Sequence, residues 1–327
     1  MTASDVVCLR PEADFLNLDV VPPKSLGIRY LQPDDDSLRD ALSSARALVI
    51  PAVGPALAPA CFENSKIELV QVTGAGVDRL NREALTTLGI PVANVAGGSN
   101  DAIAEFCVAT ALTLLRRFAW ADTEVREGRY AQARAEMLAA QLRGLRGLKV
   151  GVVGMGTIGT AVAAAFHAMG AEIVFFDPIV DSSDSIKKLS ATRMSLEELL
   201  ASADVITLHL PLIAQTRDLI DEAALARLKK DAILINAARG GIVDEAALAD
   251  ALAAGRLGGV ALDVYSAEPP EASNPLLALE GDAARRILLT PHIAGVSRQA
   301  WATLFQVAWD NVVRVLKNGE PPLNRVY

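Results

Sequence analysis

The segment that most constrains the architecture reads Lys149-Val-Gly-Val-Val-Gly154-Met-Gly156-Thr-Ile-Gly159. Its apolar first half leads into three glycines with the spacing G-x-G-x-x-G, and a second apolar run follows as far as Ala171. This order predicts a buried strand, a tight turn and a helix, because glycine allows the turn and the close approach of other backbone. The N–H groups at the start of such a helix can bind a pyrophosphate, so we expect Gly154, Gly156 and Gly159 to contact a dinucleotide.

The next predicted strand ends in an acidic residue, in the sequence Phe175-Phe176-Asp177. Asp177 lies 18 residues after Gly159, close to the ~20 at which an acid binds the ribose hydroxyls of a dinucleotide. A carboxylate at this position would repel the 2′-phosphate of NADP, so the predicted cofactor is NAD. Two alternatives stay open here: a structural glycine turn followed by a solvated aspartate, or another nucleotide binder such as a methyltransferase.

Patterns typical of strands and helices alternate on both sides of this segment. Short apolar strands separated by helices are typical of a parallel sheet that is covered on both faces. The N-terminal hundred residues show one such alternation, and a second, stronger one begins at Lys149. Strands are predicted at 47–51, 69–73, 92–95, 149–153, 172–177, 205–208, 232–237, 259–264 and 287–290. Helices are predicted at 36–45, at 81–88, at 101–117 with Ser99 or Asn100 as the cap, over 118–147, after a capping box at Ser195 and Glu198, at 244–254 and at 297–318.

These two alternations predict an α/β protein with two lobes. The larger lobe is a Rossmann-type, doubly wound parallel sheet, and it is inserted in a smaller flavodoxin-like domain. We assign residues 101–293 to the NAD-binding Rossmann domain, and residues 1–100 with 294–327 to a discontinuous substrate-binding domain. The chain would cross between the lobes near residues 101 and 294, and closure of the cleft between them would exclude water from the site.

The overall charge and the cysteines narrow the cellular setting. The 327 residues carry a net charge of −8 and no basic tract, which does not favour nucleic acid or an anionic membrane as a partner. Cys8, Cys61 and Cys107 are widely spaced, which predicts reduced cytoplasmic thiols and neither disulfides nor a metal site.

Neither a signal peptide nor a membrane span is expected from the sequence. The N-terminus lacks the apolar core of a signal peptide. The apolar run 150–171 is long enough to span a membrane, but its glycines favour the strand, turn and helix.

Three further motifs lie where predicted strands end, which is where ligands bind open parallel sheets. His292 is suited to proton transfer near neutral pH, and a carboxylate such as Glu268 beside it would orient the ring and favour its charged form. Arg239 offers a planar fork that binds the oxygens of a keto acid and stabilises developing negative charge. Taken singly, each of these residues could instead be structural. The motifs are Asn236-Ala-Ala-Arg239, Asp263-Val-Tyr-Ser-Ala-Glu268 and Thr290-Pro-His292.

The glycine motif and the three strand-end motifs, in this order, resemble those of the D-isomer-specific 2-hydroxyacid dehydrogenases. That family includes phosphoglycerate, glyoxylate/hydroxypyruvate and D-lactate dehydrogenases. The resemblance extends from about Leu69 to the C-terminus. It implies that Arg239 is the essential arginine, that Glu268 is the paired acid and that His292 is the general acid–base residue.

The resemblance also implies where cofactor and substrate bind. The substrate would be bound by Arg239 and His292 and, through its carboxylate, by backbone N–H groups of the glycine loop 74–78, at Ala75 and Gly76. His209 ends another predicted strand and is expected to shape the cofactor cleft. Beyond the three glycines and Asp177, the implied cofactor contacts are Thr157, Ile158, Leu210, Ala237, Asp263 and His292.

One stretch departs from the family. Between Asn94 and Glu105 the family commonly shows Asn-x-Pro-x-x-Asn-x-x-Ser-Val-Ala-Glu, whereas this chain has Ala96, Ser99 and Ala102 at the positions of the Pro, the second Asn and the Ser. Because this stretch approaches the expected cleft, the identity of the substrate cannot be inferred from that of any one family member.

The sequence therefore predicts an NAD-dependent oxidoreductase that transfers a hydride between the nicotinamide and a small D-2-hydroxy acid or 2-keto acid. Two alternatives stay open: an NAD(H)-binding, corepressor-like regulator built on the same fold, and a phosphite dehydrogenase. Formate dehydrogenases typically pair the histidine with glutamine, so Glu268 argues against formate. The resemblance further implies a homodimer through the NAD-binding domain, for which residues 118–147 are the candidate interface.

Overall fold

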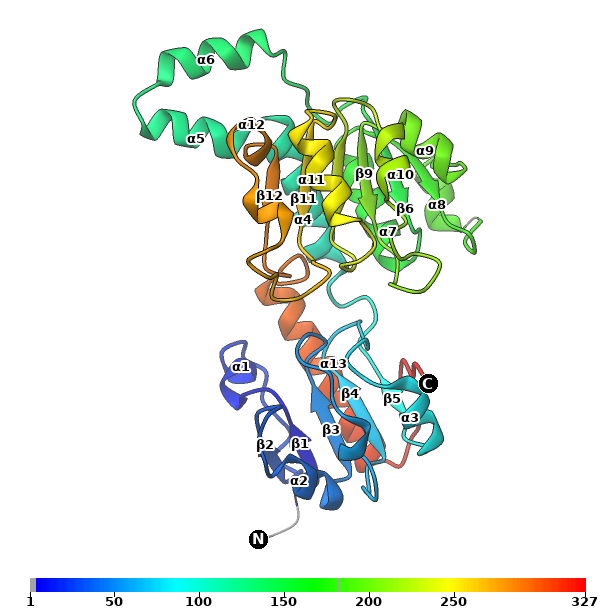
Figure 1. The fold of residues 1–327 in the computed structure, drawn as a ribbon. Coiled ribbons are helices and arrows are strands. Elements are labelled where there is room, and N and C mark those ends of the chain that lie inside the picture. The colour runs from blue at the N-terminus through cyan, green and yellow to red at the C-terminus, as the bar shows by residue number, and fades with distance from the viewer. Residues whose placement is uncertain (1–3, 182) are drawn as a thin grey trace. The chain divides into compact units, whose positions relative to one another are not determined.

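The computed structural model describes residues 4–181 and 183–327. By the density of its internal contacts the chain divides into two units (Figure 1). One unit consists of Met1–Ser99 together with Val296–Tyr327, and the other is the continuous segment Asn100–Gly295. Each unit has its own sheet and its own core, so each is described by itself.

The continuous unit is built on a seven-stranded parallel sheet with the order β12-β11-β10-β9-β6-β7-β8. Counted from its own first strand, β6, this is the order 3-2-1-4-5-6 of the Rossmann fold with one more strand beside the sixth. The order reverses between β6 and β9, where ligands of such sheets bind. The strands are β6 (Lys149–Val153), β7 (Glu172–Phe176), β8 (Thr192–Arg193), β9 (Val205–Leu208), β10 (Ile233–Asn236), β11 (Gly259–Leu262) and β12 (Ile287–Leu289).

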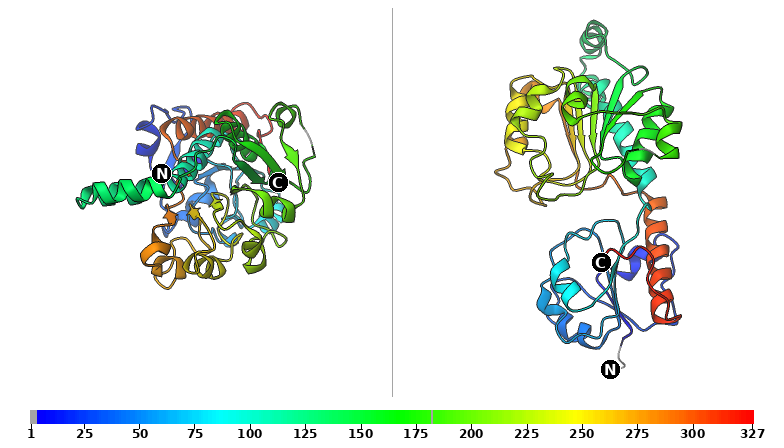
Figure 2. Two further views of the ribbon diagram at one scale, coloured as in Figure 1. Left: turned by 90° about the horizontal axis from the view of Figure 1, so that it is seen from above. Right: turned by 90° about the vertical axis from the view of Figure 1, so that its right-hand side faces the viewer.

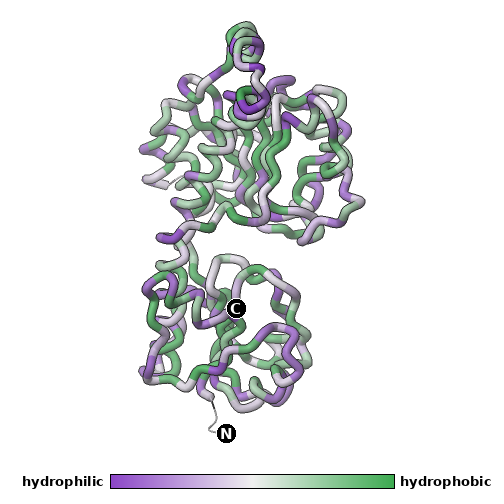
Figure 3. The backbone as a smooth tube through the Cα atoms, turned by 90° about the vertical axis from the view of Figure 1, so that its left-hand side faces the viewer, coloured by the Kyte–Doolittle hydropathy of each residue, from purple (hydrophilic) through white to green (hydrophobic). Residues whose placement is uncertain are grey.

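Helices cover both faces of this sheet (Figure 2). Successive strand residues point to opposite faces, so Val152 packs under α4 and α7 while Val153 packs under α9, α10 and α11. Burial of their residues explains why the inner strands β7, β6, β9, β10 and β11 are mostly apolar, and green, hydrophobic segments run through the middle of this unit in Figure 3. The helices are α4 (Asn100–Leu115), α5 (Phe118–Arg126), α6 (Tyr130–Ala139), α7 (Thr157–Ala168), α8 (Asp184–Lys188), α9 (Leu196–Ser202), α10 (Glu222–Arg227), α11 (Glu245–Ala253) and α12 (Gly281–Ala284), with the 3₁₀ turn η2 (Pro275–Ala278).

The discontinuous unit has a five-stranded parallel sheet with the order β2-β1-β3-β4-β5. This is the flavodoxin-like order 2-1-3-4-5. Helices α2 and α3 pack on one face of the sheet, and α1 and α13 pack on the other. The elements are β1 (Val6–Cys8), α1 (Glu12–Leu16), β2 (Ile28–Tyr30), α2 (Leu38–Ser44), β3 (Ala47–Ile50), η1 (Pro59–Cys61), β4 (Leu69–Val72), α3 (Arg82–Thr87), β5 (Val92–Ala93) and α13 (Arg298–Leu316).

The last helix, α13, completes the core of the discontinuous unit. Its Phe305 and Trp309 are almost fully buried and pack on Phe15 of α1, with ring centroids 4.8 and 5.3 Å apart. A buried amide of the same helix, Asn311, donates to the side chain of Gln71 in β4 at 2.6 Å and accepts from the N–H of Leu323 at 2.8 Å. Residues from the two ends of the sequence therefore form one core.

The two-sheet α/β architecture predicted from the sequence is confirmed, with local differences. The capping box at Ser195 and Glu198 is present, and Asp244 and Ser297 cap α11 and α13 as their sequence context indicates. The sequence did not predict β1, β2 or β8, so the continuous unit has seven strands where six were expected.

Helices α5 and α6 form an arm that extends away from the sheet of their unit (Figure 1). The region 118–147, expected to be helical throughout, is helical only at 118–126 and 130–139: Gly128 in the left-handed conformation (φ 79°) separates the two helices, and 140–147 are not helical. Within the described parts of the chain, no helix combines the length and the apolar character needed to cross a membrane.

Candidate active site

The candidate site lies along one edge of the seven-stranded sheet, where its parallel strands end. The glycine turn follows β6, Asp177 follows β7, and Leu210 comes soon after β9. Ala237 and Arg239 follow β10, Asp263 and Glu268 follow β11, and His292 follows β12. Every catalytic or cofactor-binding residue expected in the continuous unit thus lies at, or in the helix turn just after, the strand ends of one edge, and the loop with Ala75 and Gly76 belongs to the other unit.

The glycine turn leaves room for a ligand at only one of its three glycines. A Cβ atom on Gly154 would lie 2.3 Å from the carbonyl oxygen of His209, and one on Gly159 would lie 1.9 Å from the carbonyl oxygen of Gly154. Gly156 is the N-cap of α7, and a Cβ there would meet nothing within 4 Å. Exposed Thr157 and half-buried Ile158 form the first helical turn beside it. The open backbone at Gly156 therefore suits a pyrophosphate at the start of α7.

We predict that Gly159→Ala and Gly156→Ala separate stability from cofactor binding. Gly159→Ala should lower the free energy of unfolding by about 1–3 kcal/mol, because the added methyl overlaps the Gly154 carbonyl. Gly156→Ala should leave the unfolding midpoint nearly unchanged and weaken NADH binding, because its methyl enters the ligand's space. Urea unfolding and NADH fluorescence titration measure the two effects. Equal destabilisation by both variants would contradict this account.

Asp177 is buried and is hydrogen-bonded to the backbone of the glycine turn. One carboxylate oxygen accepts the N–H of Met155 at 2.8 Å, and the other accepts the N–H groups of Ile179 and Val180 at 2.8 Å each. Burial alone raises the pKa of Asp177, but these backbone hydrogen bonds hold it below its usual value. The group is therefore an anion, and a carboxylate has about four acceptor positions, so it can also accept from a ribose hydroxyl.

His209 and Leu210 support the glycine turn from the end of β9. The N–H of His209 donates to Val153 at 2.8 Å, and its carbonyl oxygen and the side chain of Leu210 both lie against Gly154. The His209 ring is hydrogen-bonded through Nε2 to the hydroxyl of Thr207 at 2.9 Å. Burial lowers the pKa of His209 to about 3, so the ring is neutral. This agrees with a structural role at the edge of the cofactor region.

We predict that His209 destabilises the fold as the pH falls from about 6.5 towards 3. The unfolded chain takes up a proton near the ordinary pKa of 6.5, whereas the folded ring resists it until about 3. Stability should therefore fall with decreasing pH in this window, by at most about 1.4 kcal/mol per pH unit from this group. Urea unfolding of wild type and His209→Gln between pH 7 and 4 isolates the contribution, and identical slopes in the two proteins would contradict it.

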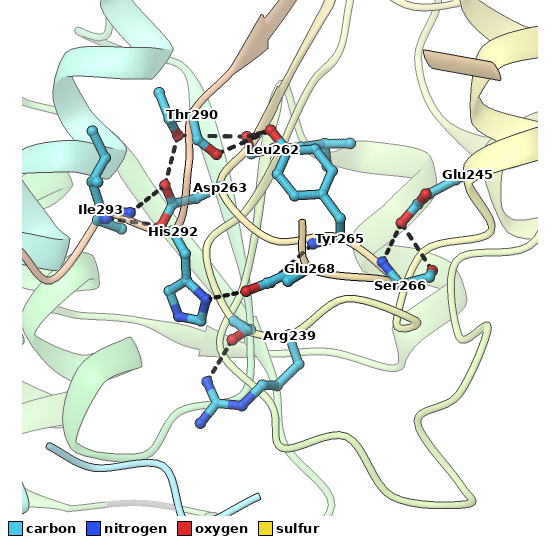
Figure 4. Close-up of polar contacts among 12 residues, drawn as sticks. Arg239, Glu245, Leu262, Asp263, Tyr265, Ser266, Glu268, Thr290, His292 and Ile293 are labelled. Carbon is cyan, nitrogen blue, oxygen red and sulfur yellow. Dashed lines mark hydrogen bonds and ion pairs between the residues drawn. The ribbon is translucent and has the colours of Figure 1, made fainter. Parts of the chain in front are cut away.

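His292 and Glu268 form a hydrogen-bonded pair (Figure 4). The Nδ1 atom of His292 lies 2.7 Å from Oε2 of Glu268, and both side chains keep more than a quarter of their surface exposed. The other oxygen of Glu268, Oε1, accepts the N–H of Tyr265 at 3.1 Å. Burial on its own raises the pKa of Glu268, but the hydrogen bond and charge of His292, the Tyr265 N–H and the charge of Arg239 hold it below its usual value.

The backbone of His292 is in the left-handed region, with φ 54°. This conformation is costly for a residue with a side chain and persists only where the surroundings impose it. Asp263 is 1% exposed and imposes it here: its carboxylate accepts the N–H groups of Ile293 and Ala294 at 2.8 Å each and the hydroxyl of Thr290 at 2.6 Å. Asp263 was expected only as a cofactor contact, and the structure gives it a role in the backbone that the sequence did not indicate.

Arg239 leaves the end of β10 beside this pair (Figure 4). Its Nη1 donates to the carbonyl oxygen of Ala238 at 2.6 Å, and its own carbonyl oxygen accepts from the side chain of Asn236 at 2.9 Å. The next residue, Gly240, packs so closely that a Cβ atom would lie 1.8 Å from the carbonyl oxygen of Tyr265. The loops with Arg239 and Glu268 are therefore in direct contact.

In the discontinuous unit, the loop 74–78 follows β4 and has an exposed residue at Ala75 and a half-buried one at Gly76. The side chain of Asn94 donates to the carbonyl oxygen of Ala75 at 2.6 Å, and the N–H of Val95 donates to the carbonyl oxygen of Gly74 at 3.0 Å. Two residues after β5 thus support the loop expected to bind the substrate carboxylate.

Comparison with known proteins identifies the family. A family profile described as the NAD-binding domain of D-isomer-specific 2-hydroxyacid dehydrogenases matches residues 108–294. The chain belongs to this family. It is 36% identical over 259 residues to a glyoxylate reductase from Aeropyrum pernix, which covers 79% of this chain and 76% of the relative.

Other relatives carry different substrate names. This family member is 36% identical over 260 residues to a D-3-phosphoglycerate dehydrogenase from Archaeoglobus fulgidus, and the match covers 80% of the chain but 47% of the relative. The chain thus spans about half the length of that relative. A solved D-lactate dehydrogenase from Treponema pallidum superposes with a TM-score of 0.80 at 29% identity, covering 98% of this chain and 99% of that one. The family and its NAD-binding unit are established by these matches, whereas the names of the relatives differ in the acid on which they act.

Proposed function

We propose that the protein is an NAD-dependent oxidoreductase that interconverts a small D-2-hydroxy acid and its 2-keto acid. The observation that carries the proposal is the 2.7 Å hydrogen bond between His292 and Glu268 beside Arg239, in a unit whose family binds NAD. The three groups are those that reduction of a keto acid needs: a proton donor, an anion that orients it and a cation for the developing charge.

The geometry of the pair gives each nitrogen of His292 a separate role. Because Nδ1 faces a carboxylate that accepts hydrogen bonds, Nδ1 carries a proton and Nε2 is the atom available to the substrate. In the reducing direction Nε2 donates its proton to the carbonyl oxygen of the keto acid, and in the oxidising direction it removes the hydroxyl proton. Glu268 accepts the hydrogen bond from Nδ1 and holds the ring in one orientation.

Two groups would bind the substrate around this reaction. The Arg239 guanidinium would bind the oxygens of the keto acid and stabilise negative charge on the C2 oxygen. Backbone N–H groups at Ala75 and Gly76 would bind the carboxylate, as glycine loops do for anions.

NAD fits the residues at the start of α7. The open backbone at Gly156 would receive the pyrophosphate, Asp177 the ribose hydroxyls, and Leu210, Ala237 and Asp263 the nicotinamide half. When bound, the nicotinamide supplies or accepts the hydride at C2 of the acid.

The direct test is absorbance at the NADH band with purified protein and a panel of keto acids. The panel contains glyoxylate, hydroxypyruvate, pyruvate, phenylpyruvate and oxaloacetate, each with NADH and with NADPH. Turnover with NADH supports the proposal and ranks the substrates. Tight NADH binding without turnover of any keto acid would contradict it and favour a regulatory NAD(H)-binding protein, or, if phosphite reduces NAD, a phosphite dehydrogenase.

We also propose that the arm of α5 and α6 makes a homodimer. The arm stands away from its sheet and exposes large apolar side chains, among them Val125 (52% exposed), Tyr130 (62%) and Leu138 (64%). A second copy that packs on this surface would remove it from water. We predict that Leu138→Glu shifts the mass in multi-angle light scattering from dimer to monomer, whereas the same change at exposed Leu277 does not. A wild-type monomer at micromolar concentration would contradict this.

A cytoplasmic location is proposed on the same footing, from the cysteines. Cys8 and Cys107 are buried free thiols, and burial raises the pKa of each to about 12. Such thiols are unreactive and suit a reducing compartment. Cell fractionation with an antibody to the protein would test this.

A further inference from the structure

Glu245 is a carboxylate that the proposed chemistry does not use, although it binds the loop that carries Glu268. It lies in the first turn of α11 and accepts the N–H of Ser266 at 2.6 Å and the hydroxyl of Ser266 at 2.8 Å through Oε1. Its other oxygen, Oε2, accepts from the side-chain amide of Asn274 at 2.6 Å. One half-buried side chain thus makes three short hydrogen bonds to a single loop (Figure 4 shows those to Ser266).

The two partners of Glu245 lie on either side of Glu268 in the sequence. On one side, Ser266 directly follows Tyr265, whose N–H donates to Glu268 at 3.1 Å. On the other side, the side-chain oxygen of Asn274 accepts the N–H of Leu276 and begins η2. The segment between these points has Glu268 near its start, so Glu245 ties down both ends of the backbone that carries it.

The same loop supports Arg239. Gly240 lies against the Tyr265 carbonyl with no room for a Cβ atom, and a Cβ there would also lie 2.6 Å from the N atom of Ser266. A displacement of Ser266 would therefore move the backbone at Gly240, next to Arg239, as well as the loop that carries Glu268. Two of the three proposed reacting side chains depend on one anchoring point.

The chemistry of the anchor requires a carboxylate. All three groups that Glu245 contacts, the N–H and hydroxyl of Ser266 and the amide of Asn274, are donors. An ionised carboxylate accepts at both oxygens, whereas a glutamine side chain would turn its NH₂ group towards one of these donors. The first turn of α11 also favours a negative charge, because the helix dipole places partial positive charge at the N-terminus of a helix. Hydrogen bonds to an ionised acceptor are stronger than those between neutral groups.

We propose that Glu245 is a positioning residue: it fixes the loop 263–274 so that the Glu268 carboxylate meets Nδ1 of His292 while Arg239 is held beside the pair. The kinetic consequence rests on the proposed function. The structural consequence does not, because the contact between Glu268 and His292 exists whether or not the protein turns over a keto acid.

The structural test compares wild type with Glu245→Ala, Glu245→Gln and the control Glu222→Ala. Glu222 is exposed and occupies the same first-turn position in α10, after its own N-cap Asp221. Hydrogen exchange of the segment 263–274 should quicken in Glu245→Ala, less so in Glu245→Gln, and not in Glu222→Ala. Nitrogen-15 spectra of the His292 ring should show the Nδ1–H tautomer in wild type and a mixture of tautomers in Glu245→Ala.

The kinetic test uses the pH profile of kcat/KM for the best keto acid. Misplacement of reacting groups by about 1 Å can reduce the rate by up to ~10²-fold, so we expect Glu245→Ala to lose between about 10-fold and 100-fold, with Glu245→Gln intermediate. The acid limb should also move to higher pH. The groups that face Glu268 are His292, Arg239 and the Tyr265 N–H, and looser contacts with them would let its pKa rise. A merely destabilised protein would not show this shift.

The outcomes separate this inference from the proposed function. If no keto acid is reduced by wild type, hydrogen exchange and the His292 tautomer still decide the role of Glu245. If hydrogen exchange of the segment 263–274 and the tautomer of His292 are both unchanged in Glu245→Ala, the inference is overturned, whether or not the protein reduces a keto acid. If Glu245→Ala does not fold, Ser266→Ala removes only the hydrogen bond from the Ser266 hydroxyl to Oε1 and should produce the same changes in weaker form, and their absence there would overturn the inference equally.

Discussion

His292→Asn is expected to lower kcat by about 10²–10⁴-fold while leaving NADH affinity within a few-fold of wild type. The range is the typical contribution of a positioned general acid or base. Asparagine is the replacement of choice because His292 has φ 54°, and asparagine adopts the left-handed backbone more readily than alanine. It can also donate a hydrogen bond to Glu268, so the loop is preserved and only proton transfer is lost. Single-turnover kinetics with NADH and the best keto acid measures the effect.

His167→Asn is the matched control for this experiment. His167 is an exposed histidine in the last turn of α7, and we expect its replacement to leave kcat unchanged. A His292→Asn protein that retains more than a tenth of the wild-type kcat, with an unchanged unfolding midpoint, would contradict the assignment of His292 as the proton donor.

Arg239→Met is expected to reduce kcat/KM for the keto acid by about 10²–10³-fold, the loss found when one group that stabilises an oxyanion is removed. Arg239→Lys should recover only part of this loss, because lysine keeps the charge but not the planar fork. NADH binding should change little, because Ala237 is the residue of this loop that is expected to contact the cofactor, and the substitution leaves it in place. Steady-state kinetics and a fluorescence titration of NADH give the two quantities.

Arg217→Met controls for the loss of a positive charge near the same loop. Arg217 is exposed, and its guanidinium lies 3.4 Å from the position of a Cβ atom on Gly241, two residues from Arg239. If the two methionine variants lose the same activity, the effect is one of general charge and not of substrate binding by Arg239. A higher KM with an unaltered kcat in Arg239→Met would show that Arg239 stabilises the bound substrate and the transition state equally.

The sequence predicted those features that depend on residues close together in the chain. The glycine turn, the capping box at Ser195 and the order of buried strands all have local signatures, and the structure has them. The residues proposed for chemistry were predicted as a set because each motif follows a strand, and parallel strands bring their ends to one edge.

The features that the sequence did not predict depend on contacts between distant residues. β1 and β2 are short, and β8 has only the two residues Thr192–Arg193, so neither length nor periodicity distinguishes them from loops. The roles of Glu245 and Asp263 depend on partners 21 to 31 positions away, Ser266 and Asn274 for one and Ile293 and Ala294 for the other. When the partners of a side chain are brought to it only by the fold, no pattern in the neighbouring sequence indicates its role.

The return of α13 to the first sheet has a consequence for biosynthesis. The continuous unit, Asn100–Gly295, emerges from the ribosome complete and can fold while the remainder is still being made. The other unit cannot: Trp309 and Phe305 fill its core, and Asn311 pairs with Gln71, so the early strands must wait for the last helix. During that interval Phe15 and the apolar residues that pack around it lie exposed, and this unit is the part of the nascent protein that a chaperone would have to shield.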